Sequence, residues 1–320
     1  MNVYKEFKCE ILTKKPTDFD VKWAQWLKEV HDIKNHIDIV KETKQSYGKL
    51  IEFYYDSVKN TKIFAKLYLQ DKLDLPVVAY YHGHGSDLDD EWNNWHAMNL
   101  VNAGFSVCSI DMRFQKGKVI DNNEYHFLEY ESICYNIDDL ENSYLKRLDQ
   151  DALKLIDILS CKDCFKELND LDIIVAGPSQ GGGLSLMVAS LSDKDILCSL
   201  SDVPSDCALR DRVLGEYGKY SIINKLINEH SDIKDKVLNN LDYFDVINMA
   251  DKIKCPVITS VGGIDNVCPP RFFYQAYKKI KAEKELYVYP EFGHGGFEEK
   301  HLPKKIDFAK KVFYKKNKWW

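Results

Sequence analysis

The segment G-P-S-Q-G at residues 177–181 places Ser179 between small residues. An apolar run at 172–176 precedes it and a helical stretch follows from Leu184, so the order is strand, sharp turn and helix. A turn of this kind lifts a serine hydroxyl into a cleft. The context predicts a nucleophilic serine. The alternative is a glycine-rich turn that only packs a helix against a strand.

A serine hydroxyl becomes nucleophilic when a base takes its proton and an acid orients that base. His294 follows an apolar run at 286–289, and Asp265 follows another at 257–261. The order serine, aspartate, histidine is that of α/β-hydrolases. Asp202 also ends an apolar run and is the competing acid. Asp265 is favoured because its strand immediately precedes that of the histidine and because it lies in a glycine-flanked turn.

Acyl transfer also needs two donors for the oxyanion of the tetrahedral intermediate. The turn itself places the backbone N–H of Gln180 at a helix start. The second donor is expected in the H-G-H-G loop after the run at 77–81, where glycines let the backbone approach a substrate, and the amide of His84 is the candidate. A metal pair of His82 and His84 is the alternative, but no carboxylate or cysteine stands at a spacing that completes the site.

The elements that must position these residues begin near residue 76, where short apolar runs start to alternate with helical stretches. Such alternation predicts an α/β fold with a mostly parallel central sheet and helices on both faces. Chemistry in such sheets lies at the carboxyl ends of the strands. The predicted strands are 77–81, 105–110, 172–176, 197–202, 257–261 and 286–289.

Residues 1–75 are expected to add a helix and edge strands to this sheet. Thr17 or Asp18 is the expected N-cap, because apolar residues follow at helical spacing. Between Ile37 and Leu69 the apolar residues tend to recur at every second position. The segments 50–55 and 63–69 flank a polar turn, which predicts an antiparallel pair of edge strands.

Two later segments carry further expectations. Residues 205–250 are rich in charge and helix formers, which predicts a small helical cap inserted into one domain that spans 1–320. The basic stretch from Lys304 to Lys318 is expected to be a closing helix packed on the sheet, with a membrane-surface helix as the alternative. The terminal Trp319-Trp320 pair is a candidate oligomer contact.

Composition excludes several classes of protein. With 45% hydrophobic and 29% charged residues, disorder is not the main state, and a net charge of −6 argues against nucleic acid as the main partner. The chain shows neither a secretory signal nor a membrane-spanning run, so a soluble, cytoplasmic protein is expected. Nine scattered cysteines predict reduced thiols. The C-x-x-C of Cys161 and Cys164 lacks the second pair of a zinc site.

Several segments together resemble carbohydrate esterase family seven, the acetyl xylan esterases and cephalosporin C deacetylases. The similarity runs along most of the chain and includes PTDFDVKWAQWLKEV (16–30) and DEWNNW (90–95). The most specific segments are HGHG (82–85), GPSQGGG (177–183), SDVP (201–204), VGGIDNVCPP (261–270) and YPEFGHGG (289–296).

This resemblance implies that Ser179 is the nucleophile, Asp265 the acid and His294 the base. It also implies that the amides of Gln180 and His84 form the oxyanion hole. The family removes acetyl groups from short oligosaccharides and small esters and forms hexamers, so a small acetylated carbohydrate or another short-chain ester is the expected substrate and a homo-oligomer the expected assembly.

Three positions depart from the family pattern. His84 replaces the tyrosine of H-G-Y, Phe114 replaces the glycine of R-G-Q, and Gly295 replaces the glutamate of H-E. These changes affect the expected specificity more than the expected activity. Trp92, Trp95 and Phe114 are the candidates for lining the acyl or sugar pocket.

The sequence therefore predicts a serine carboxylesterase that needs neither metal nor organic cofactor. A neutral histidine base predicts that activity falls below about pH 6–7. A serine peptidase or acylaminoacyl hydrolase of the same fold is the enzymatic alternative, since the same side chains serve esters and amides. A non-catalytic oligomeric scaffold is the alternative from another class.

Overall fold

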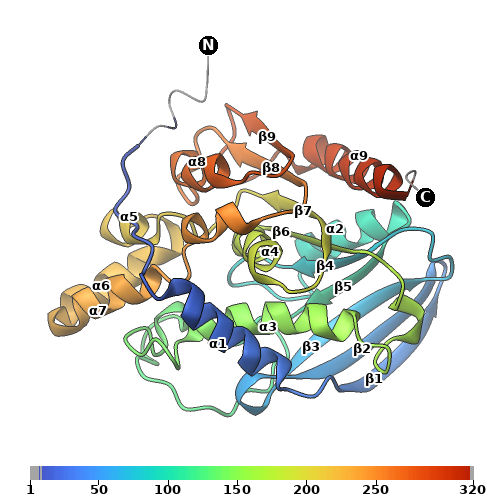
Figure 1. Cartoon of the computed structure of the whole chain (residues 1–320), viewed down its shortest axis with the longest axis horizontal. Coiled ribbons are helices and arrows are strands. Elements are labelled where there is room, and N and C mark those ends of the chain that lie inside the picture. Colours follow the sequence, from blue (N-terminus) through green and yellow to red (C-terminus); the bar gives the residue numbers. More distant parts are fainter. Residues whose placement is uncertain (1–6, 8, 318–320) are drawn as a thin grey trace.

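The computed structural model describes residue 7 and residues 9–317 (Figure 1). These residues form a nine-stranded sheet in the order β1-β2-β3-β5-β4-β6-β7-β8-β9. Pairing is antiparallel from β1 to β5 and parallel from β5 to β9. The strands are β1 (Ile37–Gln45), β2 (Gly48–Ser57), β3 (Thr61–Gln70), β4 (Val77–Tyr81), β5 (Ser106–Ile110), β6 (Ile173–Pro178), β7 (Ile196–Asp202), β8 (Val257–Gly262) and β9 (Lys284–Tyr289).

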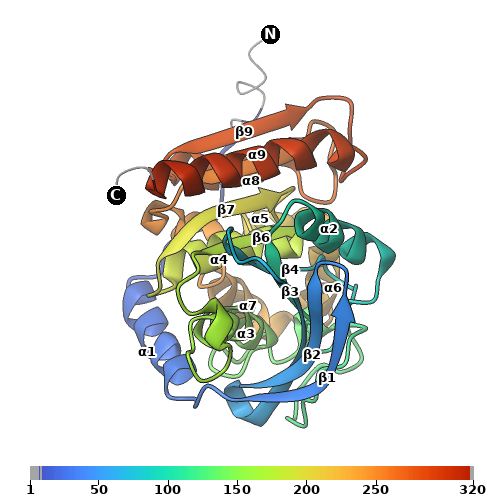
Figure 2. The same cartoon turned by 90° about the vertical axis from the view of Figure 1, so that its right-hand side faces the viewer.

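Helices cover both faces of this sheet, which explains why the inner strands read as unbroken apolar runs. In β4, Val77, Ala79 and Tyr81 face one buried cluster while Val78 and Tyr80 face another. On the first face lie α1 (Phe19–His31), α3 (Tyr144–Leu159), α4 (Gln180–Leu191) and α8 (Pro270–Lys279); on the second lie α2 (Glu91–Asn102) and α9 (Glu298–Asn317) (Figures 1 and 2).

The predicted α/β-hydrolase architecture is confirmed, and each predicted strand of the parallel region is present within two residues of its expected bounds. The antiparallel pair of β2 and β3 is also present, but its assignment to the sheet edge is wrong. Strand β1 pairs with β2 and takes the edge, at the end of the molecule away from α9 (Figure 2). Because β1 is mostly polar and exposed, it carries little apolar alternation.

The helix at the N-terminal end begins at Phe19, with Asp18 at the N-cap position. The side chain of Asp18 makes no capping hydrogen bond, so the predicted cap chemistry is wrong for this residue. Its carboxylate instead accepts a hydrogen bond from the hydroxyl of Tyr243. The contact ties the start of α1 to the end of the inserted helical segment.

The segment 205–250 lies between β7 and β8 and is helical, as the sequence predicts. Its helices are α5 (Leu209–Leu214), α6 (Ser221–Glu229) and α7 (Lys234–Leu241), joined by short 3₁₀ turns. The division of 1–320 into one domain with this insertion stays a prediction.

Helix α9 packs on the sheet beside β7 and β8, with Leu302, Phe308 and Ala309 buried against it. No helix in the described ranges combines the length and apolar character needed to cross a lipid bilayer. The Trp319-Trp320 pair lies outside the described residues.

A buried ion pair holds the loop after β5 in place. Arg113 is fully buried, and its Nε and Nη2 each donate to one carboxylate oxygen of Asp151 on α3 at 2.7 Å. Its Nη1 donates to Asp121 at 2.8 Å. The backbone carbonyl of Arg113 also accepts a hydrogen bond from the Tyr144 hydroxyl at 3.0 Å. The loop that carries Gln115 is therefore fastened to α3.

We expect Arg113→Ala to lower the free energy of unfolding by about 3–5 kcal/mol, because it leaves two buried carboxylates without their cation. Urea unfolding followed by circular dichroism measures the loss. The matched control is Lys28→Ala, which breaks an exposed ion pair with Asp32 and should cost no more than about 1 kcal/mol. Equal losses in the two variants would contradict this account of Arg113.

Candidate active site

Ser179 stands in the turn between β6 and α4 in a conformation that few side chains adopt, with φ 55° and ψ −116°. Neighbouring glycines make the turn possible. A Cβ at Gly177 or Gly181 would lie 2.3 or 1.9 Å from the carbonyl oxygen of Tyr81, closer than atoms can pack. The Ser179 N–H donates to the Asp202 carbonyl, and the Ser205 N–H donates to the Ser179 carbonyl, both at 2.9 Å. These bonds hold the strained residue from both sides.

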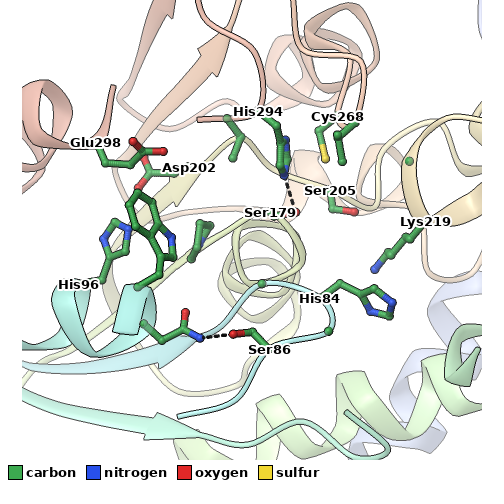
Figure 3. A pocket seen from close by; sticks show the side chains of 18 of the residues that line it. His84, Ser86, His96, Ser179, Asp202, Ser205, Lys219, Cys268, His294 and Glu298 are labelled. Atoms are coloured by element: carbon green, nitrogen blue, oxygen red, sulfur yellow. Dashed lines mark hydrogen bonds between the residues drawn. The ribbon is translucent and has the colours of Figure 1, made fainter. Parts of the chain in front are cut away.

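The structure brings Ser179, His294 and Asp265 together, as the spacing predicts (Figure 3). His294 Nε2 lies 3.0 Å from Ser179 Oγ, and His294 Nδ1 lies 2.7 Å from Asp265 Oδ2. The other carboxylate oxygen of Asp265 accepts the backbone N–H groups of Val267 and Cys268 at 2.7 and 2.8 Å. The aspartate is thus fixed with one oxygen directed at the imidazole.

Asp202, the competing acid, has other partners. Its carboxylate forms a buried ion pair with Lys305, accepts the Ser260 hydroxyl at 2.8 Å and lies 3.2 Å from His301 Nε2. Burial opposes ionisation, but the charge of Lys305 outweighs it and holds the pKa of Asp202 well below its usual range. Asp202 therefore serves to bind α9 to the sheet, and Asp265 is the acid beside His294.

The loop at 82–85 lies over the serine turn. A Cβ at Gly83 would lie 3.9 Å from Ser179 Cβ, so the backbone of this loop passes close to the hydroxyl. The His84 ring is held by the Gln180 side chain at 3.1 Å and by Glu131 at 3.3 Å. The amides of Gln180 and His84, the two predicted oxyanion donors, belong to segments that meet at Ser179.

Gln115 links the two segments. Its Oε1 accepts the Gly85 N–H at 2.7 Å, and its Nε2 donates to Gln180 Oε1 at 3.2 Å. Both nitrogens of His82 have main-chain partners, the Gly83 carbonyl at 2.7 Å and the Met112 N–H at 3.1 Å. His82 is thereby a structural residue of this loop.

A cavity of about 620 Å³ opens above Ser179. One wall comes from α2 and the start of α9, and the other comes from the inserted helical segment. Figure 3 shows His96 and Glu298 on one side of Ser179, and His84 and Lys219 on the other.

Of the three aromatic pocket candidates, only Trp92 lines this cavity. Trp95 stacks on Trp92 and faces a neighbouring groove. Phe114 packs edge-on against Tyr125 and Tyr135, with ring centroids 4.9 and 5.4 Å away. The placement of Phe114 in the pocket is therefore a correction to the sequence analysis, because two tyrosine rings hold its side chain elsewhere. Trp95 lies outside the cavity over Ser179 and lines the groove beside it.

Comparisons with known proteins agree with this geometry. A model of the family described as acetyl xylan esterase (AXE1) matches residues 3–312. The chain belongs to this acetyl xylan esterase family. It is accordingly a carboxylic ester hydrolase that acts on acetyl esters. The acetyl esterase Axe7A of Xylanibacter ruminicola is 27% identical over 311 residues, which cover 94% of this chain and 68% of that protein.

Solved structures give the same result. Acetyl xylan esterase 1 from Thermoanaerobacterium sp. JW/SL YS485 is 28% identical with a TM-score of 0.83, over 96% of this chain and 98% of that one. The acetyl xylan esterase from Paenibacillus sp. R4 is 25% identical with a TM-score of 0.82, over 95% and 97%. Est1E from Butyrivibrio proteoclasticus, bound to ferulic acid, is 16% identical with a TM-score of 0.59 over 82% and 99%, a likeness in fold alone.

Two departures of this esterase from its family pattern have a structural account. Phe114 has φ 52°, a left-handed conformation that favours glycine, and its contacts with two tyrosines offset the strain. At Gly295, the missing glutamate is replaced from further along the chain. Glu298 accepts the Gly296 N–H at 2.7 Å, so a carboxylate from the first turn of α9 holds this loop.

Several residues that line the cavity escaped the sequence analysis as contributors, among them Arg212, Lys219, Cys268 and Glu298. Arg212 and Lys219 come from the inserted segment, where no motif distinguished them from other charged residues. Cys268 belongs to the VGGIDNVCPP segment, which supports the family resemblance but does not by itself indicate a contact with the histidine. No signal marked Glu298, since its contact with the histidine loop is seen only in three dimensions.

The thiol of Cys268 lies beside His294 (Figure 3). Burial raises the pKa of this thiol, but the nearby charge of Arg212, with Nη2 3.6 Å from Sγ, and the neighbouring His294 lower it on balance. Burial opposes the protonation of His294, yet its bond to Asp265 and the neighbouring Cys268 raise its pKa above 6.5. The base is therefore surrounded by groups that favour the imidazolium.

We expect Asp265→Asn to lower kcat by about 10⁴, because the imidazole loses both its orientation and its counter-charge. Asp202→Asn should instead lower the free energy of unfolding by about 3–5 kcal/mol, because it leaves the Lys305 charge buried and unpaired. Initial rates on p-nitrophenyl acetate and urea unfolding separate the two effects. The assignment of the acid is wrong if Asp202→Asn gives the larger loss of kcat.

The raised pKa of His294 sets the acid limb of the pH profile. The neutral base is lost as pH falls through its pKa, so kcat/KM should fall with a midpoint above pH 6.5, higher than the sequence alone suggests. Cys268→Ser keeps a polar group near His294 but removes a thiol whose pKa is lowered here, so the midpoint should move to lower pH. A profile of kcat/KM on p-nitrophenyl acetate measures it, and a midpoint that stays or rises contradicts the role given to Cys268.

Proposed function

We propose that the protein is a serine esterase that removes acetyl groups from short acetylated xylo-oligosaccharides or similar small acetyl esters. One observation carries the proposal: the continuous chain of hydrogen bonds from Ser179 Oγ through His294 to Asp265 at the floor of an open cavity. The acetyl xylan esterase relatives, which align over nearly the whole chain, support the same substrate class.

In this mechanism Ser179 Oγ attacks the acetyl carbonyl carbon while its proton passes to His294 Nε2. Asp265 stabilises the imidazolium, and the amides of Gln180 and His84 hold the oxyanion. The tetrahedral intermediate then breaks its bond to the sugar oxygen, which takes the proton from His294 and leaves as the alcohol. Water attacks the acetyl-serine by the same route and releases acetate and the free enzyme.

Two alternatives make different demands on the site. A serine peptidase would use the same three side chains on an amide. A non-catalytic scaffold would not require these side chains to be hydrogen-bonded to one another. The hydrogen-bond distances in this site favour a working nucleophile over a scaffold. The full-length likeness to acetyl esterases favours esters over amides.

Assembly and location are further proposals. A homo-oligomer, hexameric by the family resemblance, is supported by the free sheet edge at β1, where Ile39 and Val40 expose apolar surface. A reducing, cytoplasmic compartment is supported by the nine cysteines, all of which are free.

We expect Ser179→Ala to lower kcat on p-nitrophenyl acetate by at least about 10⁴, since the acyl-enzyme can no longer form. A fluorophosphonate probe should label the wild type and leave the variant unlabelled. Wild type should also release acetate from acetylated xylo-oligosaccharides faster than it cleaves aminoacyl anilides. A protein that is unlabelled and inactive on every ester would be a scaffold, and one that prefers the anilides would be a peptidase.

A further inference from the structure

Helix α2 presents three side chains to the active-site cavity: Trp92, Asn93 and His96. The proposed mechanism uses none of them. They lie on the wall opposite the inserted segment, next to Glu298, and Figure 3 shows His96 and Glu298 together on that side of Ser179. The chemistry of these groups indicates what the wall binds.

Two buried polar atoms on this wall have no hydrogen-bond partner among the described residues. They are Asn93 Oδ1 and His96 Nε2, in side chains that are 3% and 2% exposed. Asn93 Nδ2 donates to Ser86 Oγ and to the Asp87 carbonyl, both at 2.8 Å, which fixes the amide so that Oδ1 is the free end. Both atoms have almost no accessible surface, so a ligand in the cavity does not reach them, and Asn93 and His96 form a buried wall beside Trp92.

The His96 ring is neutral in this setting, because burial lowers its pKa to about 3. The base of this wall therefore carries no charge.

Trp92 adds a flat apolar surface to the same wall. Trp95 stacks on it with ring centroids 5.6 Å apart and planes at 15°, and the His96 ring meets it edge-on at 4.9 Å. Although these contacts fix the indole, Trp92 remains 44% exposed. A rigid, half-exposed aromatic ring is a surface on which the apolar face of a sugar ring can pack.

A second groove of about 920 Å³ continues from the cavity past Trp92. Asp90, Trp92 and Glu298 line both hollows, so Trp92 stands at their junction. The groove carries four carboxylates against the single cation of Lys300. Such a lining accepts hydrogen bonds from neutral hydroxyl groups and repels an anionic substituent.

We propose that α2 forms a carbohydrate subsite, in which Trp92 packs against a sugar ring of a neutral oligosaccharide that runs from the cavity into the second groove, while the buried Asn93 and His96 form the uncharged wall beside it. The inference rests on the proposed function and extends it. It makes the enzyme selective for acetylated oligosaccharides of two or more sugars over acetyl esters of small alcohols.

The test compares wild type, Trp92→Ala and Trp92→Phe on acetylated xylotriose and on p-nitrophenyl acetate. For Trp92→Ala, the ratio of kcat/KM on the oligosaccharide to kcat/KM on the small ester should fall roughly tenfold, which corresponds to about 1.4 kcal/mol. Most of the loss should lie in KM. Trp92→Phe should restore most of the ratio, because it keeps an aromatic face. The control is Tyr314→Ala, which removes another half-exposed aromatic ring on α9 and should leave the ratio unchanged.

A second measurement does not depend on turnover of the oligosaccharide. Unacetylated xylotriose should inhibit wild-type hydrolysis of p-nitrophenyl acetate competitively, with an inhibition constant roughly tenfold higher in Trp92→Ala. An active wild type that xylotriose does not inhibit, or equal losses on both substrates in Trp92→Ala, overturns the subsite and leaves the esterase proposal standing. A wild type inactive on all esters overturns the proposed function instead, and calorimetric titration of xylotriose into Ser179→Ala and Ser179→Ala/Trp92→Ala then decides the subsite separately.

Discussion

The geometry of the site depends on the close approach of the Tyr81 carbonyl to the turn that carries Ser179. Any side chain at Gly177 or Gly181 would collide with this carbonyl, so two glycines and one parallel strand pair set the position of the nucleophile. Tyr81 is also the last residue of β4, directly before the histidine loop. A single register between β4 and β6 thus places the hydroxyl and the loop that carries the proposed second oxyanion donor. A similar close approach occurs between the end of β8 and the loop after β9, where a Cβ at Gly262 would lie 1.8 Å from the Gly293 carbonyl oxygen.

Two buried aspartates near the serine turn have different roles. Asp202 ends β7 and Asp265 lies in the loop after the neighbouring strand β8, yet one is neutralised by Lys305 and the other is held by two backbone amides. The first arrangement satisfies a carboxylate completely and leaves it inert. The second leaves one oxygen free for an imidazole, because amides supply hydrogen bonds without a full opposing charge. The partners of each aspartate therefore decide its role.

The sequence predicts those parts of the fold that follow from local pattern. Strands buried on both faces read as apolar runs, and the glycines of the serine turn are required by local contacts, so these features were visible without coordinates. Strand β1 was missed because its residues are polar and exposed, and its place is set by pairing with β2. Phe114 was misplaced for a related reason. Its ring packs against Tyr135, which is close in space but distant in the sequence, so a local sequence pattern does not reveal the contact.

The two walls of the cavity differ in electrostatic character, which bears on how an ester can enter. The inserted segment supplies Arg212 and Lys219, and burial lowers the pKa of Lys219 although Asp206 lies 3.5 Å away. The α2 wall is neutral at its base and acidic at its rim, where Asp90 and Glu298 lie. A neutral sugar loses little by leaving water for the α2 wall, whereas an acyl carbonyl, whose oxygen becomes negative during reaction, gains from facing away from those carboxylates. For the proposed substrate, the asymmetry favours an orientation of the ester bond over Ser179 in which the sugar lies towards α2 and the oxyanion lies towards the amides of Gln180 and His84.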